Sequence, residues 1–233
     1  MKNSLLIITI LCVGNLIFVM PTFAAKEKAA AAETHLSPEI MEANYTKAIE
    51  GRTANILKAL ALSDTNQAAR VHNIIMAQWR ALRAWHDTND VKLEQAFKAG
   101  DSNAVAQIRT SLKSLHNEFL SRLSARLTPS QVDTVKDRMT YDKVEVTYNA
   151  YCQIVPNLTA AEKAAILQLL KQAREEAMDC GSAEEKSAAF KKYKGKINNY
   201  LTVQGHDVSK AYKEWGEKQK MKAAERSAPA PAR

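Results

Sequence analysis

One line of polar and aromatic side chains carries the chemistry of a site for an acidic sugar. If residues 65–86 form a helix, spacings of three and four place five side chains on one face: His72, Met76, Trp79, Arg83 and His86. An arginine fork matches a carboxylate, and an indole face stacks on a sugar ring. A histidine oriented by a neighbouring acid is also a candidate general base. The pattern favours a structural alternative, in which Trp85 continues a buried stripe and residues 86–90 are a helix end and turn.

A second polar line follows the helix that we expect over residues 183–203. Lys192, Lys196 and Asn199 recur along it at spacings of four and three residues. Gly195 lies in the middle of this helix, where glycine costs about 1 kcal/mol relative to alanine. That cost suggests the close approach of another backbone or of a ligand. The favoured alternative is a solvated lysine face whose glycine admits a neighbouring helix.

A third group places two carboxylates beside two cations. Asp133 and Asp137 are one helical turn apart and are candidates for paired carboxylates. Because Lys136 and Arg138 lie in the same turn, an ion-pair network is the expected outcome.

The predicted ligand-binding residues come from the first two groups and from Tyr141, which belongs with the third: Arg83, His86, Tyr141, Lys192, Lys196 and Asn199. The cations would pair with a carboxylate, the amide would bond to hydroxyl groups, and the tyrosine would stack or donate. These residues form one site only if their helices are neighbours. Convergence on one cleft would indicate an enzyme, whereas scatter would indicate a binding or structural role. No catalytic residue is assigned.

The sequence predicts neither a metal site nor a cofactor. His72 and His86 are 14 residues apart, about 21 Å along one helix, and cannot share an ion. The chain has no His-x-x-x-His or Cys-x-x-Cys spacing, no nucleophile elbow, no P-loop and no dinucleotide fingerprint.

The elements that position these residues are predicted to be helices. Glycine and proline are sparse, and capping-box spacings recur at Asp64 with Gln67, Thr128 with Gln131, Thr159 with Glu162, and Ser182 with Glu185. We expect helices near residues 38–61, 65–86, 91–99, 102–126, 129–138, 160–179, 183–203 and 208–221. Residues 144–148 remain open between an extended segment and the start of a helix to Gln153. The predicted fold class is all-α, a single compact domain of about seven or eight helices in an antiparallel bundle-like arrangement.

The N-terminus is typical of an exported protein. A start containing Lys2 precedes an apolar run, and Thr22 and Ala24 fit the positions before a cleavage site. We predict a signal peptide over residues 1–24, a flexible leader over 25–36, the helical domain over 37–216 and a basic, Ala/Pro-rich disordered tail over 217–233. The expected location is periplasmic or secreted, with no transmembrane segment after signal cleavage.

The net charge of the chain limits the class of partner that we expect. The chain carries 33 Lys+Arg and 25 Asp+Glu, a net charge of +8, which favours anionic partners such as acidic glycans. Nucleic acid is not expected as a partner, because an exported protein would not meet it and the chain has no nucleic-acid-binding motif.

Cys152 and Cys180 flank the helix expected over residues 160–179, and this helix holds its two ends about 30 Å apart. We therefore expect no disulfide between them.

Five segments of the chain carry a resemblance to known sequences: 81–87 (ALRAWHD), 127–131 (LTPSQ), 136–141 (KDRMTY), 174–179 (REEAMD) and 192–201 (KYKGKINNYL). They resemble a family of secreted bacterial all-helical proteins known as a domain of unknown function. The resemblance covers most of residues 37–207 and implies an exported helical domain. It supplies no reaction, substrate or catalytic residue, although family members tend to be associated with polysaccharide-using bacteria.

Several classes of function therefore remain open. The first is an exported accessory or binding protein that recognises an acidic glycan or a partner protein. The second is an enzyme that acts on an anionic saccharide, with His86 as its base. The third, a periplasmic helical chaperone, depends only on the segment 127–131, which is also an ordinary capped helix start.

Overall fold

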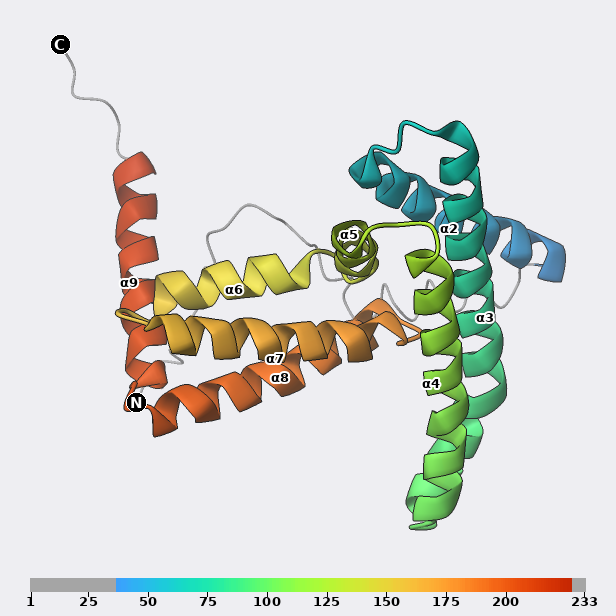
Figure 1. Cartoon of the computed structure of the whole chain (residues 1–233). Coiled ribbons are helices and arrows are strands. Elements are labelled where there is room, and N and C mark those ends of the chain that lie inside the picture. The colour runs from blue at the N-terminus through green and yellow to red at the C-terminus, as the bar shows by residue number, and fades with distance from the viewer. Residues whose placement is uncertain (1–36, 228–233) are drawn as a thin grey trace, which may run out of the picture.

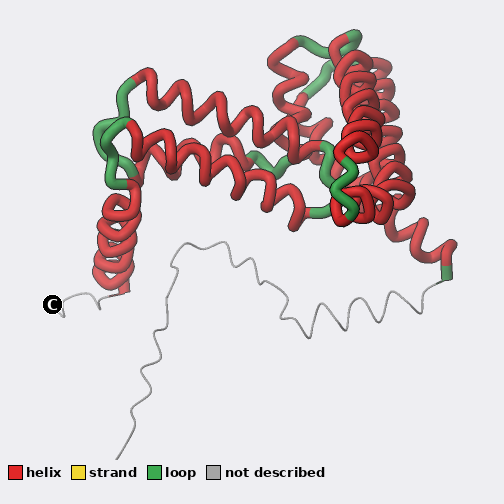
Figure 2. The backbone as a smooth tube through the Cα atoms, turned by 90° about the horizontal axis from the view of Figure 1, so that it is seen from below, coloured by secondary structure: helices red, strands yellow, loops and turns green. Residues whose placement is uncertain are grey.

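The computed structural model describes residues 37–227, and this part of the chain is built of helices without a strand (Figure 1, Figure 2). The helices are α2 (Pro38–Leu60), α3 (Thr65–Lys98), α4 (Ser102–Ser124), α5 (Pro129–Met139), α6 (Lys143–Ile154), α7 (Ala160–Met178), α8 (Ala183–Val203) and α9 (Val208–Ser227). The all-α fold class and the single domain are confirmed. The predicted signal peptide (1–24) and leader (25–36) lie outside the described residues. No described helix is long and apolar enough to cross a membrane.

Side-chain caps begin most of the helices. Thr128, Thr159 and Ser182 each form the predicted capping box. The box predicted at Asp64 is wrong. Asp64 caps α3 alone, because the side-chain amide of Gln67 donates to the carbonyl oxygen of Arg126, 2.5 Å away. This bond ties the start of α3 to the turn that follows α4.

Helix α3 is longer than predicted. It continues through residues 86–90, so the helix end and turn expected there are wrong. No glycine or proline interrupts this stretch, and the side chains of Thr88 and Asn89 donate to carbonyl oxygens four residues earlier, at 2.8 Å. These polar residues therefore bond to the helix that they were expected to end.

Two further stretches are also helical: one that was left open and one that was predicted to be disordered. Residues 144–148 lie in α6, the helical one of the two alternatives left open. Helix α9 ends at Ser227, so residues 217–227 of the predicted disordered tail are helical, and the rest of that tail lies outside the described residues.

The helices enclose two hydrophobic cores. The first lies among α2, α3, α4 and α5, and the second among α6, α7, α8 and α9. Met178, at the end of α7, belongs to the first core and so joins the two. The antiparallel hairpin of α3 and α4 stands across α6, α7 and α8 (Figure 1). Along α4, only Phe119 and Leu123 are buried.

Both cysteines of the described region are free. Cys152 lies near the end of α6 and Cys180 follows α7, so the length of α7 separates them as predicted. The thiols are only partly buried, but the intervening helix holds them too far apart for a disulfide.

Gly195 is approached by nothing, which corrects the expectation of a close backbone or ligand. A Cβ built on it meets no atom within 4 Å, and the residue is exposed. We therefore expect Gly195→Ala to raise the free energy of unfolding by about 0.5–1 kcal/mol, because alanine loses less backbone freedom in a helix. Thermal denaturation should show a rise in Tm of about 2–4 °C at most. Gly205→Ala is the matched control and should lower Tm, because Gly205 has a φ of +94°. A fall in Tm for Gly195→Ala would mean that α8 needs glycine there.

Candidate functional site

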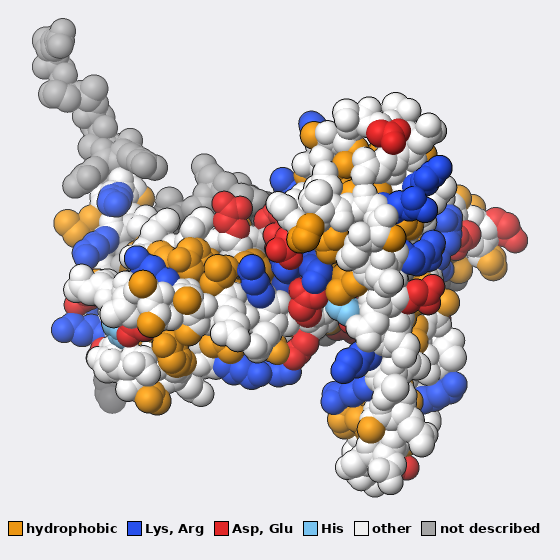
Figure 3. All heavy atoms as spheres, in the orientation of Figure 1, with side chains coloured by type: hydrophobic (Ala, Val, Ile, Leu, Met, Phe, Trp, Pro, Cys, Tyr) orange, Lys and Arg blue, Asp and Glu red, His pale blue; other side chains and the backbone are white. Residues whose placement is uncertain are grey.

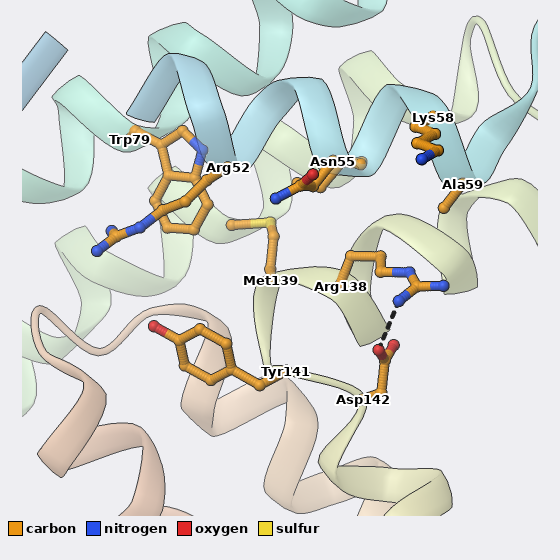
Figure 4. A pocket seen from close by; sticks show the side chains of 10 residues that line it. Arg52, Asn55, Lys58, Ala59, Trp79, Arg138, Met139, Tyr141 and Asp142 are labelled. Carbon is orange, nitrogen blue, oxygen red and sulfur yellow. Dashed lines mark hydrogen bonds and ion pairs between the residues drawn. The ribbon is translucent and has the colours of Figure 1, made fainter. Parts of the chain in front are cut away.

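A cleft of about 670 Å³ opens between α2 and the turn that joins α5 to α6 (Figure 4). Its lining residues are Arg52, Asn55, Ile56, Lys58 and Ala59 of α2, Trp79 of α3, and Arg138, Met139, Tyr141 and Asp142 of the α5–α6 region. We call it the α2–α5 cleft. Figure 4 shows Trp79 and Met139 at the inner wall, with Arg52 and Asn55 on one side and Tyr141 on the other. The volume is within the range of small-molecule sites.

The register of α2 turns its polar side chains to the cleft. Ile49, Thr53, Ile56 and Leu60 are buried and fix one face of α2 against the first core. Arg52 flanks that buried stripe, Asn55 and Lys58 lie farther round the helix, and all three line the cleft.

The opposite wall is a turn with an uncommon backbone. Tyr141 and Asp142 have φ values of +60° and +53°, the left-handed region that residues with a Cβ seldom adopt. The Asp142 amide donates to the carbonyl oxygen of Asp137 at 2.8 Å, which closes α5 and lets α6 begin. Such a conformation costs about 1 kcal/mol or more per residue and is found preferentially at functional sites. Here it holds the half-exposed ring of Tyr141 at the cleft.

The cleft has more positive charge than the protein neutralises. Arg138 pairs with Asp142 at 2.7 Å. Within residues 37–227, Arg52 and Lys58 have no carboxylate partner, and the side chain of Asn55 has no hydrogen bond. The Arg52 guanidinium lies 5.6 Å from the centroid of the Trp79 ring. Trp79 is 7 % exposed, and its Nε1 is buried without a hydrogen-bond partner.

This arrangement is suited to binding an anion that also has a planar or ring-shaped surface. Two cations and an amide supply donors, and the half-exposed ring of Tyr141 supplies a face for packing. The one carboxylate of the cleft, Asp142, is held by Arg138 and is not available as a general base.

Of the six predicted site residues, only Tyr141 lies at this cleft. Arg83 pairs with Glu42 at 2.9 Å and with Asp87 at 3.8 Å, and its guanidinium stacks on Tyr45, 4.2 Å from the ring centroid. It therefore joins α3 to α2 on a different part of the first core.

His86 joins the hairpin to the loop between α7 and α8. Its Nδ1 lies 2.9 Å from Asp90, and its Nε2 lies 2.8 Å from the carbonyl oxygen of Asp179. The ring also fills the space beside Gly181, where a Cβ would come within 3.1 Å of it. Both ring nitrogens are thus engaged in structural contacts, and the predicted role as a base has no support.

The three predicted residues of α8 lie on its own surface. Lys192 pairs with Glu176 at 2.9 Å, Lys196 lies 4.2 Å from the centroid of the Tyr193 ring, and Asn199 is exposed. The predicted residues therefore lie on separate surfaces and do not form one site.

The cleft residues that sequence reasoning missed are Arg52, Asn55 and Lys58. The sequence shows that these polar residues lie outside the stripe of Ile49, Thr53 and Ile56, but every amphipathic helix has polar residues outside its buried stripe. Only the packing of α5 against α2 distinguishes this one.

The charged residues of α5 form ion pairs, but the pairs expected within one turn of α5 are wrong, because Asp133, Asp137 and Lys136 pair with α7 instead. Arg174 of α7 is 3 % exposed and bonds to Asp133 at 2.6 Å and to Asp137 at 2.8 Å. Lys136 pairs with Glu175 at 2.8 Å. In Figure 3, basic and acidic side chains gather around a histidine where α4 meets the end of α7. We call these contacts the α5–α7 network.

His116 of α4 completes this network. Its Nδ1 lies 2.9 Å from Asp179 and its Nε2 lies 3.4 Å from Glu175. Hydrogen bonds to Asp179 and then to Glu175 raise the pKa of His116 to about 9. Burial alone would raise the pKa of Glu175, but the hydrogen bonds from His116 and Lys136 outweigh it and bring that pKa to about 2. Among the described residues, no group of His, Cys, Asp and Glu side chains is arranged to hold a metal ion.

The stability of the protein should therefore depend on pH through His116. The unfolded pKa is about 6.5 and the folded pKa about 9, so the His116 contribution is complete below pH 6.5 and is lost as pH rises to 9. Glu175 contributes fully above about pH 4.5 and loses its contribution as pH falls towards 2. Urea unfolding should show wild type losing about 1–3 kcal/mol relative to His116→Gln between pH 6.5 and 9. Parallel pH profiles for the two proteins would refute this.

The comparisons with known proteins identify a family without a known activity. The chain has no significant match among characterised proteins. A family model described as a protein of unknown function, DUF3826, matches residues 46–222. This region includes α3 to α8, most of α2 and α9, and every residue of the α2–α5 cleft. Because the match covers most of the chain, this protein belongs to the DUF3826 family of proteins of unknown function.

Proposed function

We propose that this protein is an exported binding protein that recognises an acidic saccharide in the α2–α5 cleft. The observation that carries the proposal is the pair of cations, Arg52 and Lys58, that face the cleft without a carboxylate partner in the described part of the chain. An unpaired arginine and lysine in one cleft favour a ligand that brings its own negative charge.

The other cleft residues favour a sugar among anionic ligands. The half-exposed ring of Tyr141 offers an aromatic surface on which a sugar ring packs, and the Asn55 amide is a donor and acceptor for hydroxyl groups. In this arrangement Arg52 and Lys58 bind the carboxylate of a uronic acid, and Asn55 sets the orientation of the ring.

Export is part of the proposal. It is supported by the charged start, the apolar run and the small residues Thr22 and Ala24 of the sequence. The overall charge of +8 is consistent with a partner that is acidic. An enzymatic role has less support, because the cleft holds no free carboxylate or histidine to act as a base.

Calorimetric titration of residues 25–233 tests the proposal. The probes are tetragalacturonate and galactotetraose, which differ in having a carboxylate or a hydroxymethyl group on each ring. We expect the acidic probe to bind and the neutral probe to bind at least tenfold more weakly, since a charge-assisted hydrogen bond contributes about 1.5–3 kcal/mol. Equal binding of both probes, or no binding of the acidic one, would overturn the proposal.

A further inference from the structure

Behind the inner wall of the cleft lies a buried lysine. Lys186 of α8 is 3 % exposed, and its Nζ donates to the carbonyl oxygens of Ala177 at 2.8 Å and Met178 at 3.3 Å. These are the last carbonyls of α7, and that of Ala177 also accepts hydrogen bonds from the backbone amides of Asp179 and Cys180. The ammonium group thus has hydrogen bonds, but it has no ion pair within the described residues.

The carboxylates around Lys186 are already engaged elsewhere. Asp179, in the loop before α8, pairs with His116 at 2.9 Å. Glu185, on α8 itself, accepts hydrogen bonds from the backbone amides of Gly181 and Ser182. The other titratable groups that face the ammonium are the Cys180 thiol and, from α2, the like-charged Arg52. A buried charge without a counter-charge is costly and calls for compensation.

The position of Lys186 connects it to the cleft. Its Nζ lies 5.8 Å from the centroid of the Trp79 ring, and the Arg52 guanidinium lies 5.6 Å from the same centroid. Trp79 lines the cleft, so the buried ammonium lies against one of the rings that form the cleft wall. An anion seated there would be close to two positive charges that the protein leaves uncompensated.

We infer that Lys186 is a hidden part of the anion site, whose charge the bound ligand balances through the Trp79 wall. This inference rests on the proposed function and adds a residue that does not touch the ligand. Lys186 acts through electrostatic attraction over a short distance in a poorly hydrated region, where charges interact more strongly than in water. It selects for negative charge and not for a particular sugar.

The inference makes the affinity depend on pH in a defined direction. Burial lowers the pKa of Lys186 to about 8, and the nearby Arg52 adds to this effect. An anion in the cleft favours the charged ammonium, so binding should raise that pKa and take up a proton. Affinity for an acidic ligand should therefore fall as pH rises from 7 to 9, while affinity for a neutral ligand should not.

Two variants test the inference on residues 25–233. Lys186→Met removes the charge and keeps the length of the side chain, and Lys186→Gln removes the charge but retains a donor for the α7 carbonyls. Each variant is titrated with tetragalacturonate and with galactotetraose at pH 6.5, 8 and 9, and circular dichroism verifies that each is folded. We expect both variants to bind tetragalacturonate about three- to tenfold more weakly at pH 6.5 and to lose the pH dependence of wild type, with galactotetraose unaffected.

The outcomes separate this inference from the proposed function. Wild-type affinity and a wild-type pH profile in either folded variant would overturn the role of Lys186 and leave the acidic-saccharide site intact. An equal loss of affinity for both probes would also overturn it, because Lys186 would then support only the shape of the cleft. Failure of wild type to bind tetragalacturonate would refute the proposed function and this inference together.

Discussion

Replacing Arg174 with methionine is expected to lower the free energy of unfolding by about 3 kcal/mol, the largest effect that we predict for a single substitution. Arg174 is buried between α5 and α7 and bonds to both Asp133 and Asp137. Methionine fills a similar volume but leaves two carboxylates without their cation. These carboxylates are partly exposed, so water recovers some of the loss, and the effect should fall at the lower end of the range for buried ion pairs. Tm should fall by about 6–12 °C.

The matched control for this substitution is Arg138→Met. Arg138 also pairs with an aspartate, but its side chain is 48 % exposed, against 4 % for Arg174, and its partner Asp142 lies one turn away in the chain. Such a pair contributes at most about 1 kcal/mol, so Tm should change little. Adding Asp133→Asn and Asp137→Asn to Arg174→Met should restore part of the lost stability, since the unpaired charges are then gone. If Arg174→Met is no less stable than Arg138→Met, α5 and α7 are not held together by this network.

Reversing two charges at the α2–α5 cleft is expected to remove the binding of an acidic saccharide. In Arg52→Glu with Lys58→Glu, two attractive contacts become repulsive, and the affinity for tetragalacturonate should fall at least 100-fold. The folded structure should be nearly unaffected, because Lys58 is exposed and neither residue has an ion pair among the described residues. The measurement is calorimetric titration of the variant beside wild type, with thermal denaturation of both.

A control variant with the same change in net charge separates the cleft from the general surface. Arg70 and Lys171 are exposed, have no ion pair in the described region and do not line the cleft. Arg70→Glu with Lys171→Glu should bind tetragalacturonate about as well as wild type. A similar loss in both double variants would show that binding depends on overall charge and not on the α2–α5 cleft.

The local structure of this protein could be predicted from its sequence because the signals that begin helices act over three or four residues. Thr128, Thr159 and Ser182 each cap the expected helix start, and the scarcity of glycine and proline excluded most other structures. The same local reasoning failed where a polar stretch was compatible with either a helix end or a continuing helix. His86 to Asn89 resembled a helix end, but their side chains bond to the helix and to the α7–α8 loop.

The candidate site could not be predicted in the same way, because its residues are far apart in the chain. Tyr141 was identified as a candidate, yet its partners Arg52 and Lys58 sit on α2, and nothing in the spacing of either segment refers to the other. Arg83, Lys192 and Lys196 also have charges suited to an acidic ligand. In the fold, however, Arg83 and Lys192 pair with glutamates, Lys196 lies over the Tyr193 ring, and none of them reaches the cleft.

The sequence by itself determined the all-α class and most of the helix boundaries, since these follow from contacts within a helical turn. Only the tertiary structure decided which polar residues are paired and which remain free. Arg174 pairs with two carboxylates across a helix interface, whereas in the described part of the chain Arg52 and Lys58 pair with none, and Lys186 is buried near Arg52. The physical reason is that a charged group is neutralised by a group of opposite charge within a few ångströms. Helix packing, and not spacing along the chain, brings such groups together.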